Sequence, residues 1–247
     1  MSGRVHIGVG GWVFEPWRGT FYPDDLRQKD ELGYLGEHLT ATEINATYYG
    51  TQKPATFANW AKAVPDGFRF AVKASRYCTN RKVLAEAGPS IDKFVHQGIA
   101  ELGDRLGPIL WQFMPTKRFD RRDFQAFLAL LPSEVDGVPL RHALEVRHES
   151  FDDPDLLALA RDAGAAVVRA EHEEYPLIEG HDVGFSYWRL MRARDEEPAG
   201  YAKAELKDWA SRTKVQAAKG DTYVFFISGA KIRNPTAAMA LIETIGD

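Results

Sequence analysis

The chain has very little cysteine, with Cys78 as the single example among 247 residues. One thiol excludes an intramolecular disulfide and cannot supply a zinc site made of several thiolates. We therefore expect a reducing, cytoplasmic location and a thiol that serves as a small buried apolar group.

Long apolar runs and an excess of positive charge are also missing. The stretch around Ile7 and Val9 is too short for the apolar region of a signal peptide or for a membrane-spanning helix, so we expect no association with a membrane. The formal net charge is −4, which gives no overall attraction for nucleic acid. A negative net charge does not exclude a local basic patch.

What the sequence contains is the composition of an ordinary globular protein, with 45% hydrophobic and 27% charged residues. No internal repeat and no low-complexity stretch marks a linker. A chain of this length can bury its apolar surface in one core. We expect one domain over residues 1–247.

Short β-branched or aromatic runs alternate with helical patterns along the chain. The runs expected to be strands are His6–Gly10, Ala41–Asn45, Phe68–Lys73, Pro108–Phe113, His142–Val146, Ala165–Arg169, Gly184–Leu190 and Thr222–Ile227. The clearest helix is Asp153–Ala163, where Asp153 can cap the start and Gly164 can end it. Eight strand and helix pairs predict an α/β fold, a (β/α)8 barrel of the TIM type.

An open, doubly wound sheet is the alternative fold. It would favour a phosphate-binding glycine motif in the first turn. The segment Gly8–Gly11 does not lead into a helix, as such a motif requires, so the nucleotide-binding interpretation is weak.

Polar side chains follow the ends of the expected strands, where barrel enzymes place their working residues. They are Trp12, Glu43, Asn45, Lys73, Gln112, Glu145, Arg147, His148, Arg169, Glu171, Arg189, Arg192, Ser228 and Lys231. Side chains two apart on a strand point to one face, so Glu43 with Asn45, and Glu145 with Arg147, are expected to share the barrel mouth.

The candidate catalytic residues are Glu43, Lys73, Glu145, Arg147 and His148. A carboxylate beside a cation stays ionised as a base, and one beside another carboxylate can act as an acid. His148 is a candidate acid or base near neutral pH, with a satisfied hydrogen-bonding histidine as the alternative. For the carboxylates, the alternative is an Arg–Glu lattice that only satisfies charges at the top of the barrel.

We further expect Glu145 and Arg147 to bond to groups from adjacent strands, not simply to each other. The partners are expected among Lys73, Gln112, Arg169 and Glu171.

The candidate substrate-binding residues are Trp12, Asn45, Tyr49, Gln112, Arg189, Arg192, Ser228 and Lys231. The loops after the seventh and eighth strands commonly hold a phosphate in barrel enzymes. The arginines that leave the seventh strand and the turn Ser228–Lys231 therefore favour an anionic or phosphorylated ligand. The alternative is a solvated basic loop whose arginines only pair with the acidic residues 195–197.

No histidine spacing matches a metal-binding motif, and no metal ligand or cofactor is assigned. A mixed site from Glu43, Glu145, His148 and Glu171 can be imagined around a divalent ion, but no local motif supports it.

Several segments together resemble the family called domain of unknown function 72, the YecE-like proteins. They are residues 7–12, 17–23, 43–49, 68–74, 106–112 and 145–148. The resemblance covers nearly the whole chain and implies a barrel. It also implies the residues to watch, which are Glu43, Asn45, Tyr49, Lys73, Gln112, Glu145, Arg147, His148 and Arg189.

The chain departs from the family pattern at Thr79-Asn80, Met191 and Ile227-Ser228, where many members carry histidine or asparagine. This is typical of a divergent branch, which uses Met191-Arg192 and the turn Ser228–Lys231 instead.

Three functions are the hypotheses. The first is an acid–base enzyme, whether hydrolase, lyase or isomerase, on a small anionic or phosphorylated substrate, with Glu145 or Glu43 as base. The second is a phosphodiester hydrolase acting on nucleic acid, which the acidic net charge disfavours. The third is a barrel that binds a metabolite without catalysis.

Overall fold

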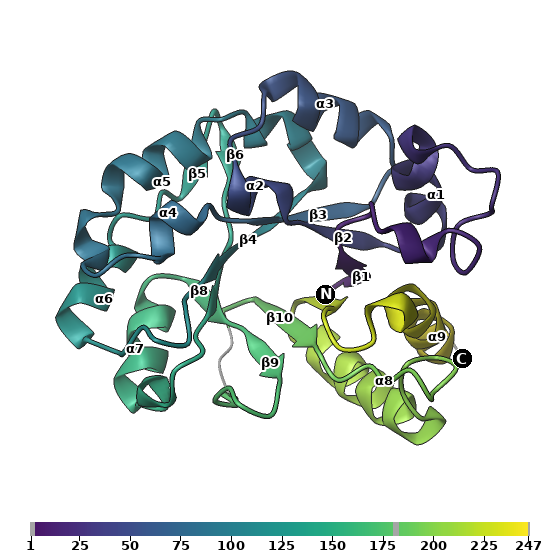
Figure 1. Ribbon diagram of the computed structural model, residues 1–247. Coiled ribbons are helices and arrows are strands. Elements are labelled where there is room, and N and C mark those ends of the chain that lie inside the picture. Colours follow the sequence, from purple (N-terminus) through teal and green to yellow (C-terminus); the bar gives the residue numbers. More distant parts are fainter. Residues whose placement is uncertain (1–2, 180–182, 247) are drawn as a thin grey trace.

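Parallel strands form one sheet that curls into a nearly closed barrel in the computed structural model, which describes residues 3–179 and 183–246 (Figure 1). The nine strands of this sheet within the described residues are β1 (Val5–Gly10), β2 (Ala41–Ile44), β3 (Arg69–Lys73), β4 (Leu106–Gln112), β7 (His142–Glu145), β8 (Ala165–Val167), β9 (Arg169–Glu171), β10 (Phe185–Leu190) and β11 (Asp221–Phe226). Their order is β8-β7-β4-β3-β2-β1-β11-β10-β9.

Strands β8 and β9 are two parts of one strand position, interrupted at Val168. β8 pairs with β7 and β9 pairs with β10, so the sheet returns on itself through this interruption. The eight strand positions confirm the predicted TIM-type barrel in a single domain.

Helices surround the barrel and cover its outer face (Figure 1). They are α1 (Glu31–His38), α2 (Ala46–Tyr49), α3 (Pro54–Lys62), α4 (Arg76–Thr79), α5 (Gly88–Val95), α6 (Arg121–Leu128), α7 (Pro154–Asp162), α8 (Lys203–Ala217) and α9 (Asn234–Gly246). Short 3-10 helices occupy Glu15–Trp17, Gln28–Asp30, Leu84–Glu86, Ile99–Arg105, Glu149–Phe151 and Lys231–Arg233. Helix α7 begins as predicted, because the Asp153 side chain accepts a hydrogen bond from the amide of Asp155 at 2.8 Å.

The regular alternation fails once, between β9 and β10, where the described residues 172–179 and 183–184 contain no helix. The prediction of eight strand-and-helix pairs is wrong at this point. The segment after β9 carries no apolar stripe of helical period, and Leu177 is exposed.

A small hairpin outside the barrel was not predicted. Its strands are β5 (Glu134–Val135) and β6 (Val138–Pro139), joined by Asp136 and Gly137 with φ of 49° and 77°. Two consecutive positive φ values define the hairpin turn that Asp-Gly favours. That dipeptide was the available signal.

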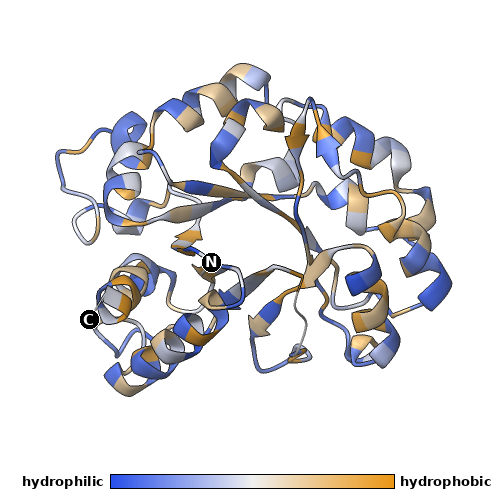
Figure 2. Ribbon diagram, turned by 180° about the vertical axis from the view of Figure 1, so that it is seen from behind, coloured by the Kyte–Doolittle hydropathy of each residue, from blue (hydrophilic) through white to orange (hydrophobic). Residues whose placement is uncertain are grey.

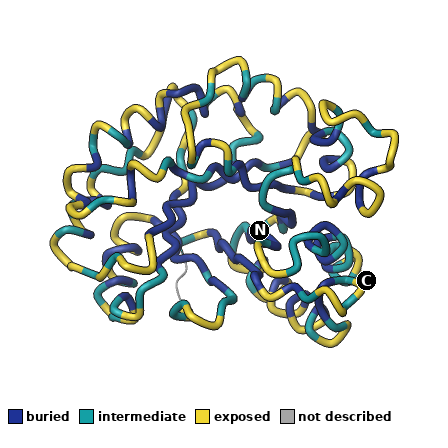
Figure 3. Tube along the Cα trace, viewed as in Figure 1, coloured by how far each residue is buried: buried dark blue, intermediate teal, exposed yellow. Residues whose placement is uncertain are grey.

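The core has two parts, one on each face of the sheet. Outward side chains such as Ile7 and Val9 pack against the helices, whereas Ala41, Ala71 and Leu110 belong to a separate apolar cluster within the barrel. Figure 3 shows the strands as a buried centre, and hydrophilic residues recur along the peripheral helices in Figure 2. Within the described residues, no helix is long and apolar enough to cross a membrane.

Candidate functional site

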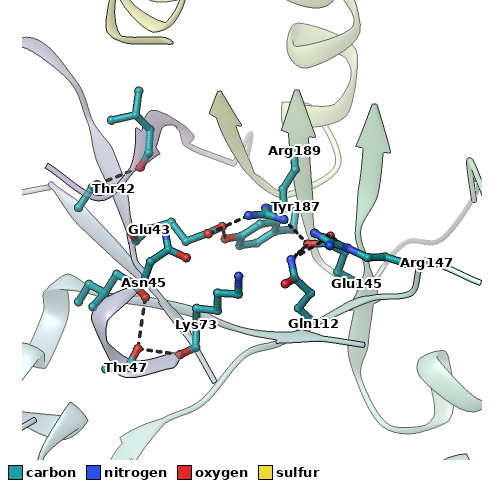
Figure 4. Close-up of polar contacts among 12 residues, drawn as sticks. Thr42, Glu43, Asn45, Thr47, Lys73, Gln112, Glu145, Arg147, Tyr187 and Arg189 are labelled. Atoms are coloured by element: carbon teal, nitrogen blue, oxygen red, sulfur yellow. Dashed lines mark hydrogen bonds and ion pairs between the residues drawn. The ribbon is translucent and has the colours of Figure 1, made fainter. Parts of the chain in front are cut away.

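A buried arginine lies between two carboxylates at the carboxyl ends of the strands (Figure 4). Arg189 on β10 pairs through Nη2 with Oε1 of Glu43 at 3.0 Å, and through Nη1 with Oε2 of Glu145 at 2.5 Å. Arg189 is 2% exposed and both glutamates are 0% exposed. Buried charges are tolerated only when they are paired, so this bridge joins β2, β7 and β10 inside the barrel.

Glu145 accepts hydrogen bonds on both of its oxygens. Gln112 Nε2 donates to Oε1 at 3.1 Å and to Oε2 at 3.2 Å, and Arg147 Nε donates to Oε1 at 2.6 Å. Burial alone would raise the pKa of Glu145, but Arg189, Arg147 and the Gln112 hydrogen bond outweigh burial and lower it to about 2. Glu145 is therefore held as an ionised, fully paired carboxylate, which makes it a poor general base.

This network differs from the prediction for Glu145 and Arg147. Gln112 is a partner as expected, but the two residues also pair directly, and Arg189 was not among the expected partners. Arg169 instead lies over the rings of Trp188 and Trp209, outside the barrel, and Glu171 accepts a hydrogen bond from the Tyr201 hydroxyl at 2.7 Å. Ala166 and Val168 belong to the apolar cluster within the barrel, so strand alternation directs Arg169 and Glu171 outward, away from Glu145.

Glu43 is fixed on its second oxygen by a residue that sequence reasoning missed. The hydroxyl of Tyr187, itself 0% exposed, donates to Oε2 of Glu43 at 2.8 Å. Burial and the Glu43 charge raise the pKa of Tyr187 well above its usual value, so the phenol stays a donor. The signal was its position two residues before Arg189 on one strand, which places both side chains on the inner face.

Lys73 is the last residue of β3, and its amine differs from the two arginines of this cluster in how it is partnered. Its Nζ lies 4.4 Å from the centre of the Tyr48 ring and forms no ion pair within the described part of the chain. Figure 4 shows the side chain directed toward the space between Glu43 and Gln112. Burial lowers the pKa of Lys73 to about 8, an effect that Glu43 opposes and Arg189 reinforces.

The backbone of Lys73 is anchored although its amine is not. The hydroxyl of Thr47 donates to the Lys73 carbonyl oxygen at 2.7 Å, and this fixes the end of β3 against α2. The amine therefore projects from a rigid strand end.

The charges of the cluster do not cancel when Lys73 is protonated. Three cations, Lys73, Arg147 and Arg189, face two carboxylates, Glu43 and Glu145, which leaves one positive charge in excess. Because both arginines are paired, the excess lies at Lys73. The geometry thus favours a single negative charge beside its Nζ.

Four predicted site residues have their partners outside this cluster. The His148 ring accepts a hydrogen bond from the amide of Ser150 at 3.0 Å and caps the short helix after β7, which agrees with the alternative of a satisfied histidine. Arg192 is exposed and pairs with Glu173 at 3.1 Å. Local turns direct these side chains, and strand periodicity does not apply there.

The other two of these predicted site residues, Ser228 and Lys231, lie after β11. Lys231 Nζ sits over the Phe14 ring at 4.0 Å, and burial lowers its pKa. Ser228 has a positive φ of 62°, and its carbonyl oxygen accepts from Asn234 at 3.2 Å. These partners, Phe14 and Asn234, lie outside the cluster of Glu43, Lys73, Glu145 and Arg189.

The other predicted binding residues lie around the mouth in different ways. Asn45 lies beside Glu43 in Figure 4, with Nδ2 3.4 Å from the Glu43 carbonyl oxygen. Trp12 packs edge-on against Trp60 at 5.1 Å, and Tyr49 is 70% exposed.

The imagined metal site is not assembled. Glu43 and Glu145 lie on opposite ends of Arg189, while His148 and Glu171 have partners elsewhere. Across residues 3–179 and 183–246, no group of three or more His, Cys, Asp and Glu side chains is arranged to hold a metal ion.

Fold and site together define a TIM-type barrel protein with a charged cluster at the carboxyl ends of its strands. A family model described as "Protein of unknown function DUF72" matches residues 6–247, and the chain belongs to this family. The resemblance seen in the sequence is confirmed.

Relatives of known sequence and structure agree with this membership. UPF0759 protein YunF of Bacillus subtilis (strain 168) is 23% identical over 264 residues, which covers 90% of this chain and 88% of that protein. The crystal structure of a DUF72 family protein from Thermotoga maritima MSB8 matches this chain with a TM-score of 0.77 and 23% sequence identity. The match covers 99% of this chain and 100% of that protein. A DUF72 family protein from Enterococcus faecalis V583 matches with a TM-score of 0.76 and 16% sequence identity. The match covers 98% of this chain and 96% of that protein.

Proposed function

We propose that the chain is an enzyme that carries out acid–base chemistry on a small anionic substrate at the barrel mouth, with Lys73 as the side chain that meets the substrate. The observation that carries this proposal is the positive charge of Lys73, which has no ion pair among the described residues, in an otherwise neutralised cluster. A substrate carboxylate or phosphate beside Nζ would balance that charge.

The residues take different roles in this proposal. Glu43, Glu145, Arg147 and Arg189 form a fixed frame of charges, and such a frame needs little rearrangement when charge develops in a reaction. Lys73 supplies the mobile proton, because an amine with a pKa of about 8 can donate and accept near neutral pH. Because both oxygens of Glu145 are already paired, Lys73 takes the role of general base that the sequence suggested for Glu145.

Substitution of Lys73 by methionine tests this assignment. Binding of inorganic phosphate, followed by titration calorimetry at pH 7, is expected to weaken at least tenfold in Lys73→Met. The free energy of unfolding is expected to stay the same or rise, because the variant removes a desolvated cation whose amine packs on a ring and not on a carboxylate.

The matched control is Lys62→Met, which removes an exposed lysine at the end of α3. It is expected to bind phosphate as the wild type does. Equal phosphate binding by wild type and Lys73→Met would contradict the proposal, as would a loss of stability in Lys73→Met without any change in binding.

A second candidate function, binding of a polyanion such as nucleic acid, is favoured by one feature. A pocket of about 480 Å³ is lined by the cations Arg81, Lys82, Lys117 and Arg118. Its residue Asn80 donates to the Tyr48 hydroxyl at 3.1 Å, and the Tyr48 ring lies under Lys73. The acidic chain thus carries a local basic patch near the site.

Oligonucleotide binding measured against salt concentration tests this alternative. If the patch holds a phosphodiester backbone, the double variant Lys82→Gln/Arg118→Gln should reduce the slope of log affinity against log salt by about two. Absence of binding at low salt, or a slope that the double variant leaves unchanged, would exclude this use of the patch.

A further inference from the structure

We infer that Lys73 is a covalent nucleophile that forms an imine with the aldehyde or ketone group of a small substrate that also carries an anionic group. The inference deepens the proposed function and rests on it. It names the reacting bond and the class of substrate for the same site.

The first argument is that Lys73 is the available nucleophile around the cluster. Within the described residues, Glu43 and Glu145 are occupied by ion pairs and hydrogen bonds, and the Tyr187 hydroxyl is bonded to Glu43. Cys78 is 0% exposed, and burial raises the pKa of its thiol to about 12. Among those same residues, the amine of Lys73 has neither an ion pair nor a hydrogen bond, and it faces the mouth.

The second argument is the reactivity of that amine. Only the neutral form of a lysine attacks a carbonyl carbon, and desolvation in a partly apolar site is one way that proteins produce it. With a pKa of about 8, a substantial fraction of Lys73 is neutral near pH 8. The packing of Nζ on the Tyr48 ring and the anchored backbone at Thr47 keep the amine in position.

The third argument is charge balance across the step. The Lys73 amine forms a C–N bond to the carbonyl carbon, and the carbonyl π electrons move to oxygen. A proton passes from nitrogen to that oxygen, and a second proton from solvent lets it leave as water. Overall, an ammonium and a carbonyl give an iminium and water, with no oxidant or reductant.

The iminium places one positive charge where the ammonium had been. Glu43 and Glu145, which already favour a charged Lys73, therefore favour the covalent intermediate in the same way. The excess charge of the cluster remains at one, and an anionic group on the substrate balances it. Arg147, whose side chain is 18% exposed, is the neighbouring cation at the rim.

Reductive trapping tests the inference on the full chain. The protein is incubated with pyruvate, as a keto acid, or with dihydroxyacetone phosphate, as a phosphorylated ketone, and sodium borohydride is added. Mass spectrometry of the intact chain and of its peptides should show one reduced adduct, located at Lys73, with a yield that increases from pH 6 to pH 8. The probe that reacts tells whether a carboxylate or a phosphate accompanies the carbonyl.

Two variants separate the covalent step from simple anion binding. Lys73→Arg keeps the positive charge but cannot form an imine, so it should retain phosphate binding within a few-fold and lose the adduct. Lys62→Arg, on the exposed end of α3, should be trapped at Lys73 as the wild type is. Urea-induced unfolding of Lys73→Arg at pH 7 shows whether this variant is folded.

The outcomes distinguish the two proposals. If phosphate binding depends on Lys73 but neither probe gives an adduct there, the imine inference is wrong and the proposed function stands. If labelling is spread over exposed lysines with no preference for Lys73, the inference is also overturned. If phosphate does not bind and no adduct forms, both proposals fail.

Discussion

Replacement of Arg189 by methionine is expected to lower the free energy of unfolding by about 3–5 kcal/mol. The side chain pairs with Glu43 and Glu145, which are both 0% exposed, and methionine keeps much of its length while removing the charge. Two buried carboxylates are then left without the cation that joins them. Urea-induced unfolding of wild type and Arg189→Met at pH 7 measures the loss.

Arg192→Met is the matched control for this prediction. Arg192 lies three residues along the chain and pairs with Glu173, but the two side chains are 54% and 76% exposed. An exposed ion pair of this kind contributes less than about 1 kcal/mol. Equal stability of the two variants would show that the buried bridge does not hold the barrel mouth together.

The second large effect is expected for Glu145→Gln. The pKa of Glu145 is lowered from 4.5 to about 2 in the folded chain, and at about 1.4 kcal/mol per pKa unit this corresponds to roughly 3 kcal/mol. Because the folded pKa lies below the unfolded value, the stabilisation is complete above pH 4.5. It is lost as the pH falls through 2. Glutamine, which cannot ionise, lacks this contribution.

Unfolding measured from pH 7 downward should therefore show a gap between wild type and Glu145→Gln that narrows below pH 4.5. Glu149→Gln, which changes a glutamate four residues along the chain and outside the cluster, serves as the control and should follow the wild type. A gap that is absent at pH 7, or that stays constant down to pH 3, would mean that the ionised form of Glu145 is not held by Arg147 and Arg189.

The barrel could be predicted from the sequence because local patterns determine it. Short β-branched or aromatic runs were sufficient to place the strands, and Asp153 with Gly164 marked both ends of α7. The pairing of Glu145 and Arg147 on one face agreed with the same period. Each of these inferences needs only residues that are close in the sequence.

The site could be predicted only in part, because its contacts join residues far apart in the chain. Arg189 reaches across the barrel to Glu43, 146 residues away, and nothing local to either residue shows that contact. Sequence reasoning left a catalytic base and an Arg–Glu lattice as alternatives for Glu145, and its geometry is that of the lattice.

Residues in loops were the least predictable. The directions of His148 and Arg192 depend on turns after β7 and β10, where the strand period no longer applies. The lack of a helix in the described residues 172–179 and 183–184 has the same origin, since the residues of a strand do not determine the structure of the next segment.

The central claim is that Lys73 presents, at the barrel mouth, an amine of lowered pKa that has no ion pair among the described residues, and its titration tests this most directly. The rate of acetylation of Lys73 by acetic anhydride, measured by peptide mass spectrometry between pH 6 and pH 11, reports the neutral fraction of the amine. We predict a midpoint near pH 8 for Lys73, below the ordinary lysine value of 10.5, and slower labelling when phosphate is present. A midpoint at the ordinary lysine value of 10.5, with no protection by phosphate, would contradict the account.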